Sequence, residues 1–213
     1  MKMKNLLKNV SFAILLFKSC LLSGQDLDAK KVVVIDPGHG GKDSGAIGEN
    51  SVQEKEVVLN IAKAILELNE KSKSPMEIYL TRYNDTLIYL SDRTKLAKTL
   101  KVDLFVSLHC NHSDNPYARG IEVYVGSQQT QYSDNATWLA FNLQANLNKK
   151  MGFESRGVKF ANFQVLRETI GYLPSVLVEL GFLSNGDEEN YYSDSKNLRL
   201  VANLILTTLK SML

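Results

Sequence analysis

The sequence predicts an α/β fold in which a mostly parallel, twisted sheet carries helices on both faces of a single domain. Short apolar runs alternate along the chain with longer segments of helical periodicity, which is the pattern of parallel strands joined by crossover helices. The first strand run is an unbroken series of β-branched residues, as expected for a strand covered on both faces. With 213 residues, 44% of them hydrophobic, the chain is long enough for one good core and short for two domains.

The strands are expected where apolar residues cluster between turn signals. The first is the run Val-Val-Val-Ile, Pro75 offers a break before the second, and the Asp-Asn-Pro turn at 114–116 precedes the fourth. The six predicted strands cover residues 32–35, 76–82, 103–108, 120–125, 163–167 and 175–179.

The helices are expected where apolar residues recur every three or four positions. Ser91 is a suitable N-cap for the second helix, and the third presents an apolar face suited to packing on the sheet. The four predicted helices cover residues 54–68, 91–100, 135–149 and 196–213.

Residues 1–25 are interpreted as a cleaved signal peptide. A basic stretch precedes the apolar run 10–17, the small polar stretch 19–25 offers a cleavage site, and the run is too short to span a bilayer. Cleavage would leave Cys110 as the one cysteine, without an internal disulfide. The expectation is export to the periplasm, with secretion or a lipid anchor on Cys20 as alternatives. A buried N-terminal helix is a further alternative to the signal peptide.

Two common functions find no support. The net charge of +2 comes without a basic stripe, so nucleic-acid binding is not indicated. The Gly-rich loop after the first strand also lacks the phosphate-binding pattern, because Asp36 and Asp43 stand where a Walker loop needs Gly and Ser or Thr.

Four residues, His39, Glu54, His109 and Glu179, stand at the ends of predicted strands or at the start of a helix. Taken singly, each has an ordinary structural explanation, such as a turn histidine or a carboxylate favoured by the helix dipole. Ligands bind at the carboxyl ends of parallel strands, where all four are expected. Two imidazoles and a carboxylate can hold one catalytic zinc ion, and a second carboxylate can act as a general base.

The segments around these residues resemble the catalytic domain of zinc-dependent N-acetylmuramoyl-L-alanine amidases. The resemblance runs from residue 31 to residue 213 and implies that this range is a zinc amidase catalytic domain. It implies zinc ligands at His39, Glu54 and His109 and a catalytic glutamate at Glu179. The segments that carry it are IDPGHGGKDSGAIG, EKEVVLNIAKAILEL, LTRYND, DLFVSLHCNHS, GIEVYV and VLRETIGYLPSVLVELGFLSN.

This resemblance implies a peptidoglycan hydrolase that cleaves the amide between the lactyl group of N-acetylmuramic acid and L-alanine of the stem peptide. Zinc would activate the attacking water, with Glu179 as general base and then general acid. The alternatives are a silent wall-binding module and a zinc peptidase acting on ordinary peptides. Some family members carry an inserted helix that blocks the cleft until a partner removes it. Residues 126–158 hold one convincing helix, so no regulatory protein partner is expected.

Other residues near the four are assigned secondary roles. Asp36 either orients His39 or caps the Pro-Gly turn, and Asn111 and Arg167 either face the cleft or bond within their loops. His112 is expected in solvent, and Cys110 is expected to be buried and turned away from His109, because neighbouring side chains on a strand point to opposite faces.

Overall fold

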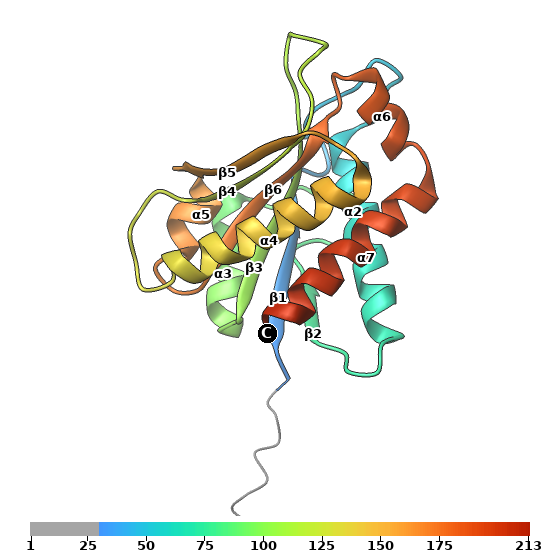
Figure 1. Ribbon diagram of the computed structural model, residues 1–213. Helices are drawn as coiled ribbons and strands as arrows, with labels where there is room; N and C mark the ends of the chain where they lie inside the picture. Colours follow the sequence, from blue (N-terminus) through green and yellow to red (C-terminus); the bar gives the residue numbers. More distant parts are fainter. Residues whose placement is uncertain (1–29) are drawn as a thin grey trace, which may run out of the picture. The chain divides into compact units, whose positions relative to one another are not determined.

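The centre of the computed structural model, which describes residues 30–213, is a six-stranded sheet of order β2-β1-β3-β6-β4-β5 (Figure 1). All neighbouring strands are parallel except β4 and β6, which run antiparallel. The predicted mostly parallel sheet is therefore confirmed. The strands are β1 (Val32–Pro37), β2 (Glu77–Leu80), β3 (Leu104–Asn111), β4 (Ile121–Gly126), β5 (Ser155–Ala161) and β6 (Ser175–Phe182).

Helices cover both faces of the sheet, as predicted. On one face, in front in Figure 1, lie α2 (Glu54–Glu70), α4 (Ser133–Met151) and α7 (Ser195–Met212), which share the larger apolar core. The other face carries α3 (Leu90–Leu100) and α5 (Gln164–Thr169), which pack over a smaller apolar cluster. Residues Lys31–Leu213 form one compact unit, and the predicted signal peptide and Cys20 lie outside the described residues.

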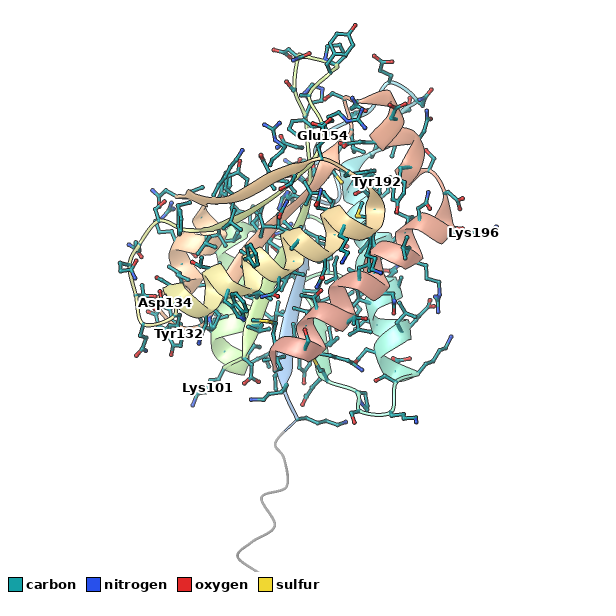
Figure 2. The ribbon with its side chains drawn as sticks, viewed as in Figure 1. Lys101, Tyr132, Asp134, Glu154, Tyr192 and Lys196 are labelled. Carbon is teal, nitrogen blue, oxygen red and sulfur yellow. The ribbon has the colours of Figure 1, made fainter. Side chains whose placement is uncertain are left out.

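The two ends of the sheet have different surroundings, and the site lies at only one of them. Figure 2 shows Lys101, which precedes β3, at the opposite end of the molecule from Tyr192 on α6 (Gly186–Tyr192). The Tyr192 hydroxyl donates to the carbonyl of Leu180 near the carboxyl end of β6. The carboxyl ends of β1, β3 and β6 therefore lie at the α6 end. Within the described part of the chain, no helix is both long enough and apolar enough to cross a membrane.

The predicted strand at 163–167 is wrong, because α5 occupies most of this segment and the strand, β5, comes earlier. A short apolar run has no periodicity that separates a strand from one turn of buried helix. Here the adjacent residues Val165 and Leu166 are both buried, which breaks the alternation expected of a strand, and Phe163 is the N-cap of α5. β5 is an edge strand and carries polar residues, so it lacks the apolar pattern of the inner strands.

Two further details at helix starts differ from the prediction. Helix α3 begins at Leu90 with Tyr89 at its N-cap, and no side chain caps it, so the assignment of Ser91 as the cap is wrong. The short α6 was not predicted, because its seven residues are too few to show a period. It is capped instead by Asn185, whose side chain accepts from the backbone N–H of Glu188.

The interval between β4 and β5 holds one helix, α4, as predicted. Its apolar side packs on the sheet and on α7 through Leu139, Leu143 and Leu147, which are fully buried. On its outer side, Trp138 and Phe141 are more than half exposed and stack on each other. Helix α4 is thus part of the core layer and does not lie across the carboxyl ends of the strands.

Because Leu143 is buried and Trp138 is exposed on the same helix, the two positions test this packing. We expect Leu143→Ala to lower the free energy of unfolding by about 2–5 kcal/mol, through lost apolar burial and the cavity left behind. Trp138→Ala should change it by less than about 1 kcal/mol. Urea denaturation of both variants followed by circular dichroism measures the difference, and equal losses would contradict the assigned orientation of α4.

Candidate metal centre

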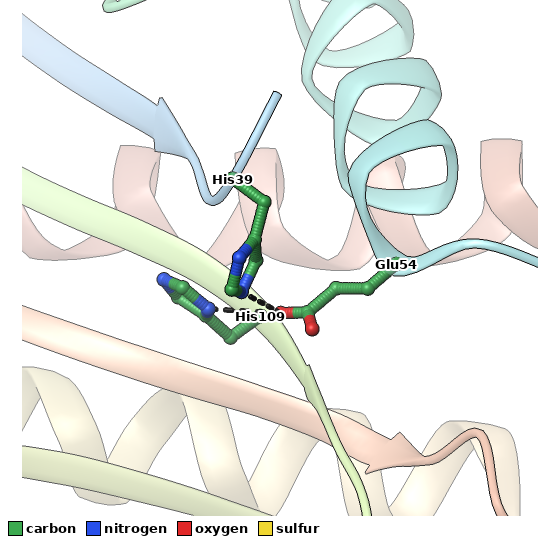
Figure 3. A group of neighbouring side chains, drawn as sticks. All are labelled: His39, Glu54 and His109. Carbon is green, nitrogen blue, oxygen red and sulfur yellow. Dashed lines mark hydrogen bonds and ion pairs between the residues drawn. The ribbon is translucent and has the colours of Figure 1, made fainter. Parts of the chain in front are cut away.

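Three of the four predicted site residues meet at the carboxyl ends of β1 and β3 (Figure 3). His39 lies in the loop after β1, Glu54 is the first residue of α2, and His109 lies in β3. Their ligand atoms all lie within 4.8 Å of one another. Glu54 Oε1 is 3.1 Å from His39 Nε2 and 2.8 Å from His109 Nδ1.

The fourth residue, Glu179, lies beside this group. In the parallel pairing of β3 and β6, Glu179 faces His109 directly, so the two side chains rise from the same face of the sheet. Both residues lie inside their strands, since β3 runs on to Asn111 and β6 to Phe182, rather than at the strand ends as predicted. Within residues 30–213, the buried Glu179 Oε2 atom has no hydrogen-bond partner.

Glycines let the backbone of the His39 loop approach the other site residues closely. A Cβ on Gly38 would lie 2.3 Å from the ring of His109, and a Cβ on Gly45 would lie 2.4 Å from Glu54 Oε2. His39 itself has a φ of 58°, a left-handed conformation that costs free energy in a non-glycine residue. The loop must therefore be held by its surroundings.

Two buried arginines hold the loop by donating to its backbone carbonyls. Arg82 donates from Nε to the Pro37 carbonyl and from Nη2 to the Gly38 carbonyl, at 3.0 and 2.7 Å. Arg93 donates from Nη1 to Pro37 and from Nη2 to His39, both at 2.7 Å. These side chains, 3% and 2% exposed, replace the water that would otherwise solvate a surface loop.

Asp36 does not orient His39, contrary to one of its two predicted roles. Its carboxylate pairs with Arg93 Nη1 at 2.7 Å and accepts from the hydroxyls of Thr81 and Ser107. The carboxylate that orients His39 is Asp43, whose Oδ2 lies 2.9 Å from His39 Nδ1. This leaves Nε2 of His39 directed at Glu54, and a histidine ligand held by a carboxylate is typical of metal sites.

The charges of the cluster suit a divalent cation. Burial alone would raise the pKa of Glu54, but hydrogen bonds from the two histidines lower it to about 2. Burial alone would lower the pKa of His39, whereas its contacts with Glu54 and Asp43 raise it to about 8. The cluster thus stabilises positive charge between the rings. Two neutral imidazoles and one carboxylate are donors that zinc prefers, so the residues fit this metal.

For Glu179, in contrast to Glu54, the effect of burial on the pKa outweighs that of the neighbouring histidines. Burial raises the pKa of this carboxyl, His109 lowers it, and the negative charges of Glu54 and Glu122 raise it, which together give a pKa of about 7. A carboxyl group that titrates near neutrality, and whose Oε2 is unpartnered, is suited to accept and return a proton.

A cleft of about 420 Å³ opens in front of these groups. His39, His109 and Glu179 line it together, so a bound molecule would reach all three. One wall is apolar, with Tyr89 and Leu90 at its exposed rim. The apolar residues that line the cleft are Leu87, Ile88, Tyr89, Leu90, Phe163, Val165 and Leu177.

The secondary predictions had mixed outcomes. Cys110 is 3% exposed and belongs to the larger core, on the opposite face from the cleft, and His112 is exposed, both as predicted. Asn111 donates to Glu122 and Arg167 donates to the carbonyl of Asn162, so both bond within the protein. Sequence reasoning missed Asp43, although its spacing of four residues from His39 in a Gly-rich loop could have indicated a contact.

Comparison with known proteins identifies the family. The N-acetylmuramoyl-L-alanine amidase family matches residues 33–211, and the chain belongs to it. The chain is 40% identical over 159 residues to the N-acetylmuramoyl-L-alanine amidase LytC of Bacillus subtilis, covering 74% of this chain and 30% of LytC. It is 35% identical to the probable cell wall amidase LytH of Staphylococcus saprophyticus, covering 85% of this chain and 58% of LytH. The chain thus spans 30% and 58% of the length of these two relatives.

Solved structures agree with this membership. The catalytic domain of the amidase CwlV from Bacillus (Paenibacillus) polymyxa superimposes with a TM-score of 0.77 at 35% identity, covering 85% of this chain and 97% of that one. The CwlD amidase of Clostridioides difficile, solved in complex with the GerS lipoprotein, superimposes with a TM-score of 0.76 at 26% identity. The match covers 86% of this chain and 98% of CwlD.

The contact between Asp43 and His39 predicts a role in metal affinity. We expect Asp43→Ala to weaken zinc binding about tenfold, since loss of the group that orients a metal-binding histidine typically costs 10- to 100-fold and Asp43 is half exposed. Competition with a chromophoric chelator measures the affinity. Glu49→Ala, in an exposed position of the same segment, is the control and should leave it unchanged.

The buried Asp36–Arg93 pair predicts a large stability effect. Arg93→Met would leave the fully buried Asp36 carboxylate without its cation and should lower the free energy of unfolding by about 3–5 kcal/mol. Lys95→Met, on an exposed position of the same helix, should change it by less than about 0.5 kcal/mol. Chemical denaturation of the metal-free protein compares the two, and a small effect at Arg93 would contradict the role of this pair.

Proposed function

We propose that the chain is a zinc-dependent N-acetylmuramoyl-L-alanine amidase acting on peptidoglycan. It would hydrolyse the amide between the lactyl group of N-acetylmuramic acid and L-alanine of the stem peptide. The observation that carries the proposal is the convergence of His39, Glu54 and His109 on one point, with the buried Glu179 carboxyl beside them in the same cleft.

In this proposal, His39, Glu54 and His109 hold one Zn²⁺ ion. When bound, zinc supplies a Lewis acid that makes water a nucleophile near neutral pH and polarises the amide carbonyl. Asp43 holds His39 by its Nδ1, so that the ring presents Nε2 to the cluster. Glu54 keeps its second oxygen on the backbone N–H of Ala46, at 2.8 Å, which fixes the orientation of the carboxylate.

Glu179 carries the proton through the reaction. Its carboxylate accepts a proton from the attacking water, which then forms the new bond to the amide carbon. The protonated carboxyl next donates this proton to the departing L-alanine nitrogen, because an amide anion is too poor a leaving group. A pKa of about 7, raised chiefly by burial, makes both directions of transfer accessible near neutral pH.

Two other functions share parts of this site. A silent wall-binding module would need no proton carrier, so the unpartnered Oε2 of Glu179 favours an enzyme. A zinc peptidase would use the same groups on an ordinary peptide bond. The reaction products distinguish an amidase from a peptidase. An amidase releases intact stem peptides with a free L-alanine amine, whereas a peptidase shortens the stem peptides.

We also propose that the protein is exported and acts in the periplasm, as an uncomplexed enzyme. Names of relatives as cell wall amidases support export, and the predicted signal peptide at 1–25 is consistent with it. Lipid anchoring through Cys20 and secretion are the alternatives. Since CwlD is solved with a lipoprotein, the expectation that this chain needs no protein partner is tested by assaying it alone.

Replacement of the proposed proton carrier tests the function. We expect Glu179→Gln to retain zinc and to lower turnover of purified peptidoglycan by at least about 10²-fold, since the amide cannot take up the proton. Mass spectrometry of the released muropeptides, with and without a chelator, identifies the bond cleaved. Glu56→Gln, exposed in the first turn of α2, is the control and should be fully active. Full activity of the Glu179 variant would refute the assigned role.

A further inference from the structure

We propose that Arg156 and Lys159, on the edge strand β5, form a subsite for a carboxylate of the substrate peptide, close to the amide that is cleaved. The inference rests on the proposed amidase function and deepens it, because it states where the peptide lies and which of its groups the enzyme recognises. It is carried by the placement, the charge and the exposure of these two side chains.

The pairing of the strands places the two cations in line with the proposed proton carrier. Glu179 of β6 faces His109 on one side and Glu122 of β4 on the other, so the three residues form a row across the sheet. Arg156 of β5 continues this row, since its Nε donates to Glu122 Oε2 at 2.8 Å. With neighbouring strands about 4.8 Å apart, β5 runs about 10 Å from Glu179.

The cleft and the cation pair share a continuous surface. Lys159 pairs with Tyr124 across β4 and β5, and Tyr124 pairs with Leu177, which lines the cleft. The Tyr124 ring also contacts the ring of Phe163, edge to face at 5.0 Å, and Phe163 lines the cleft as well. A substrate that extends from Glu179 across β4 would therefore reach Lys159 and Arg156.

Glu122 organises this subsite without cancelling its charge. It is 2% exposed and accepts from Arg156, from Lys159, from the Tyr124 hydroxyl and from Asn111 Nδ2. Burial alone would raise the pKa of Glu122, but these donors lower it below its usual range, so the carboxylate is ionised. One negative charge faces two cations, so the group of Glu122, Arg156 and Lys159 together carries one positive charge.

Both cations keep donors for a ligand while their stems are held in place. The side chains of Arg156 and Lys159 are 37% and 38% exposed. Within residues 30–213, their one further hydrogen bond is from Arg156 Nη1 to the Arg119 carbonyl, at 3.4 Å. The Arg156 guanidinium lies over the ring of Phe182 and Lys159 over that of Tyr124, so both groups are pre-organised.

The chemistry of the substrate indicates which group would bind here. On the sugar side of the scissile amide, the lactyl carboxyl is consumed in the bond itself. The stem peptide carries free carboxylates, and two extended residues span about 7 Å. The side chains of Arg156 and Lys159 are long and extend from β5 toward β4. A carboxylate on the residue after L-alanine would therefore lie within their reach when the scissile amide is at Glu179. Charge-assisted hydrogen bonds from these two partly exposed cations would make the enzyme select substrates that carry such a carboxylate.

Two matched substrates test the subsite. Both are N-acetylmuramoyl peptides of sequence L-Ala-D-Glu-L-Lys in which L-Lys is joined to the γ-carboxyl of D-Glu, and they differ in having the α-carboxyl of D-Glu either free or as a carboxamide. We expect the zinc-loaded wild-type protein to favour the free acid about tenfold in kcat/KM, mainly through KM, as for one charge-assisted hydrogen bond. Raising the salt concentration should reduce this preference.

Single variants locate the preference on the protein. Lys159→Gln and Arg156→Gln should each lower kcat/KM for the free acid about tenfold and leave the amidated substrate unchanged. Each variant keeps one cation on Glu122, and thermal unfolding checks that the fold is retained. Lys159→Arg should restore the preference. Lys63→Gln, in an exposed position of α2, is the control and should behave as wild type.

The outcomes separate the subsite from the function. If the wild-type protein cleaves both substrates equally, or favours the amidated one, the subsite is overturned while the amidase proposal stands. Equal losses on both substrates in the two Gln variants would likewise overturn it and indicate a structural role. If the wild-type protein cleaves neither substrate nor purified peptidoglycan, the amidase proposal fails and the subsite fails with it.

Discussion

The carboxylate of Glu54 is the constraint on which the rest of the site depends. It is 3% exposed, and an ionised group removed from water is costly unless charges and hydrogen bonds compensate it. The compensation comes from His39 and His109 and from the backbone N–H groups of Ala46 and Cys110. Since these partners belong to the loop after β1 and to β3, one buried charge joins the start of α2 to two strands.

In the loop that carries His39, hydrogen bonds from protein groups take the place of hydrogen bonds to water. Its carbonyls accept from Arg82 and Arg93, and Asp36 neutralises Arg93 from within β1. This support explains how a non-glycine residue is held at a positive φ, and it gives a site on a loop the rigidity that the proposed metal binding requires. The two arginines thus determine the position of His39 without touching its ring.

The antiparallel direction of β4 determines the surroundings of Glu179. Because β4 runs antiparallel to β6, the first residues of β4 lie beside the last residues of β6, and Glu122 comes to face Glu179. The negative charge of Glu122 contributes to the raised pKa of Glu179, while hydrogen bonds from Lys159, Arg156 and Tyr124 lower the pKa of Glu122 itself against the effect of burial. A buried carboxylate on the neighbouring strand therefore contributes to the charge around the proposed proton carrier.

The sequence by itself determined the alternation of strands and helices, the face that α4 buries, and the four residues proposed to carry the chemistry. These features are local: unbroken apolar runs, helical periodicity, and polar residues placed where apolar runs end. Buried inner strands such as β1 and β3 were therefore found, whereas the polar edge strand β5 was assigned too late in the chain, and α6 was missed because its seven residues show no period.

Only the tertiary structure decided which carboxylate serves which partner. Asp36 is closer to His39 in sequence than Asp43, yet Asp36 lies within β1 and pairs with Arg93, whereas Asp43 follows the positive-φ residues 39–41 and reaches the ring. Glu122 meets Glu179 and Arg156 through strand pairings between segments more than 30 residues apart. Pairings of this kind depend on sheet order and strand direction, which no local pattern of residues encodes.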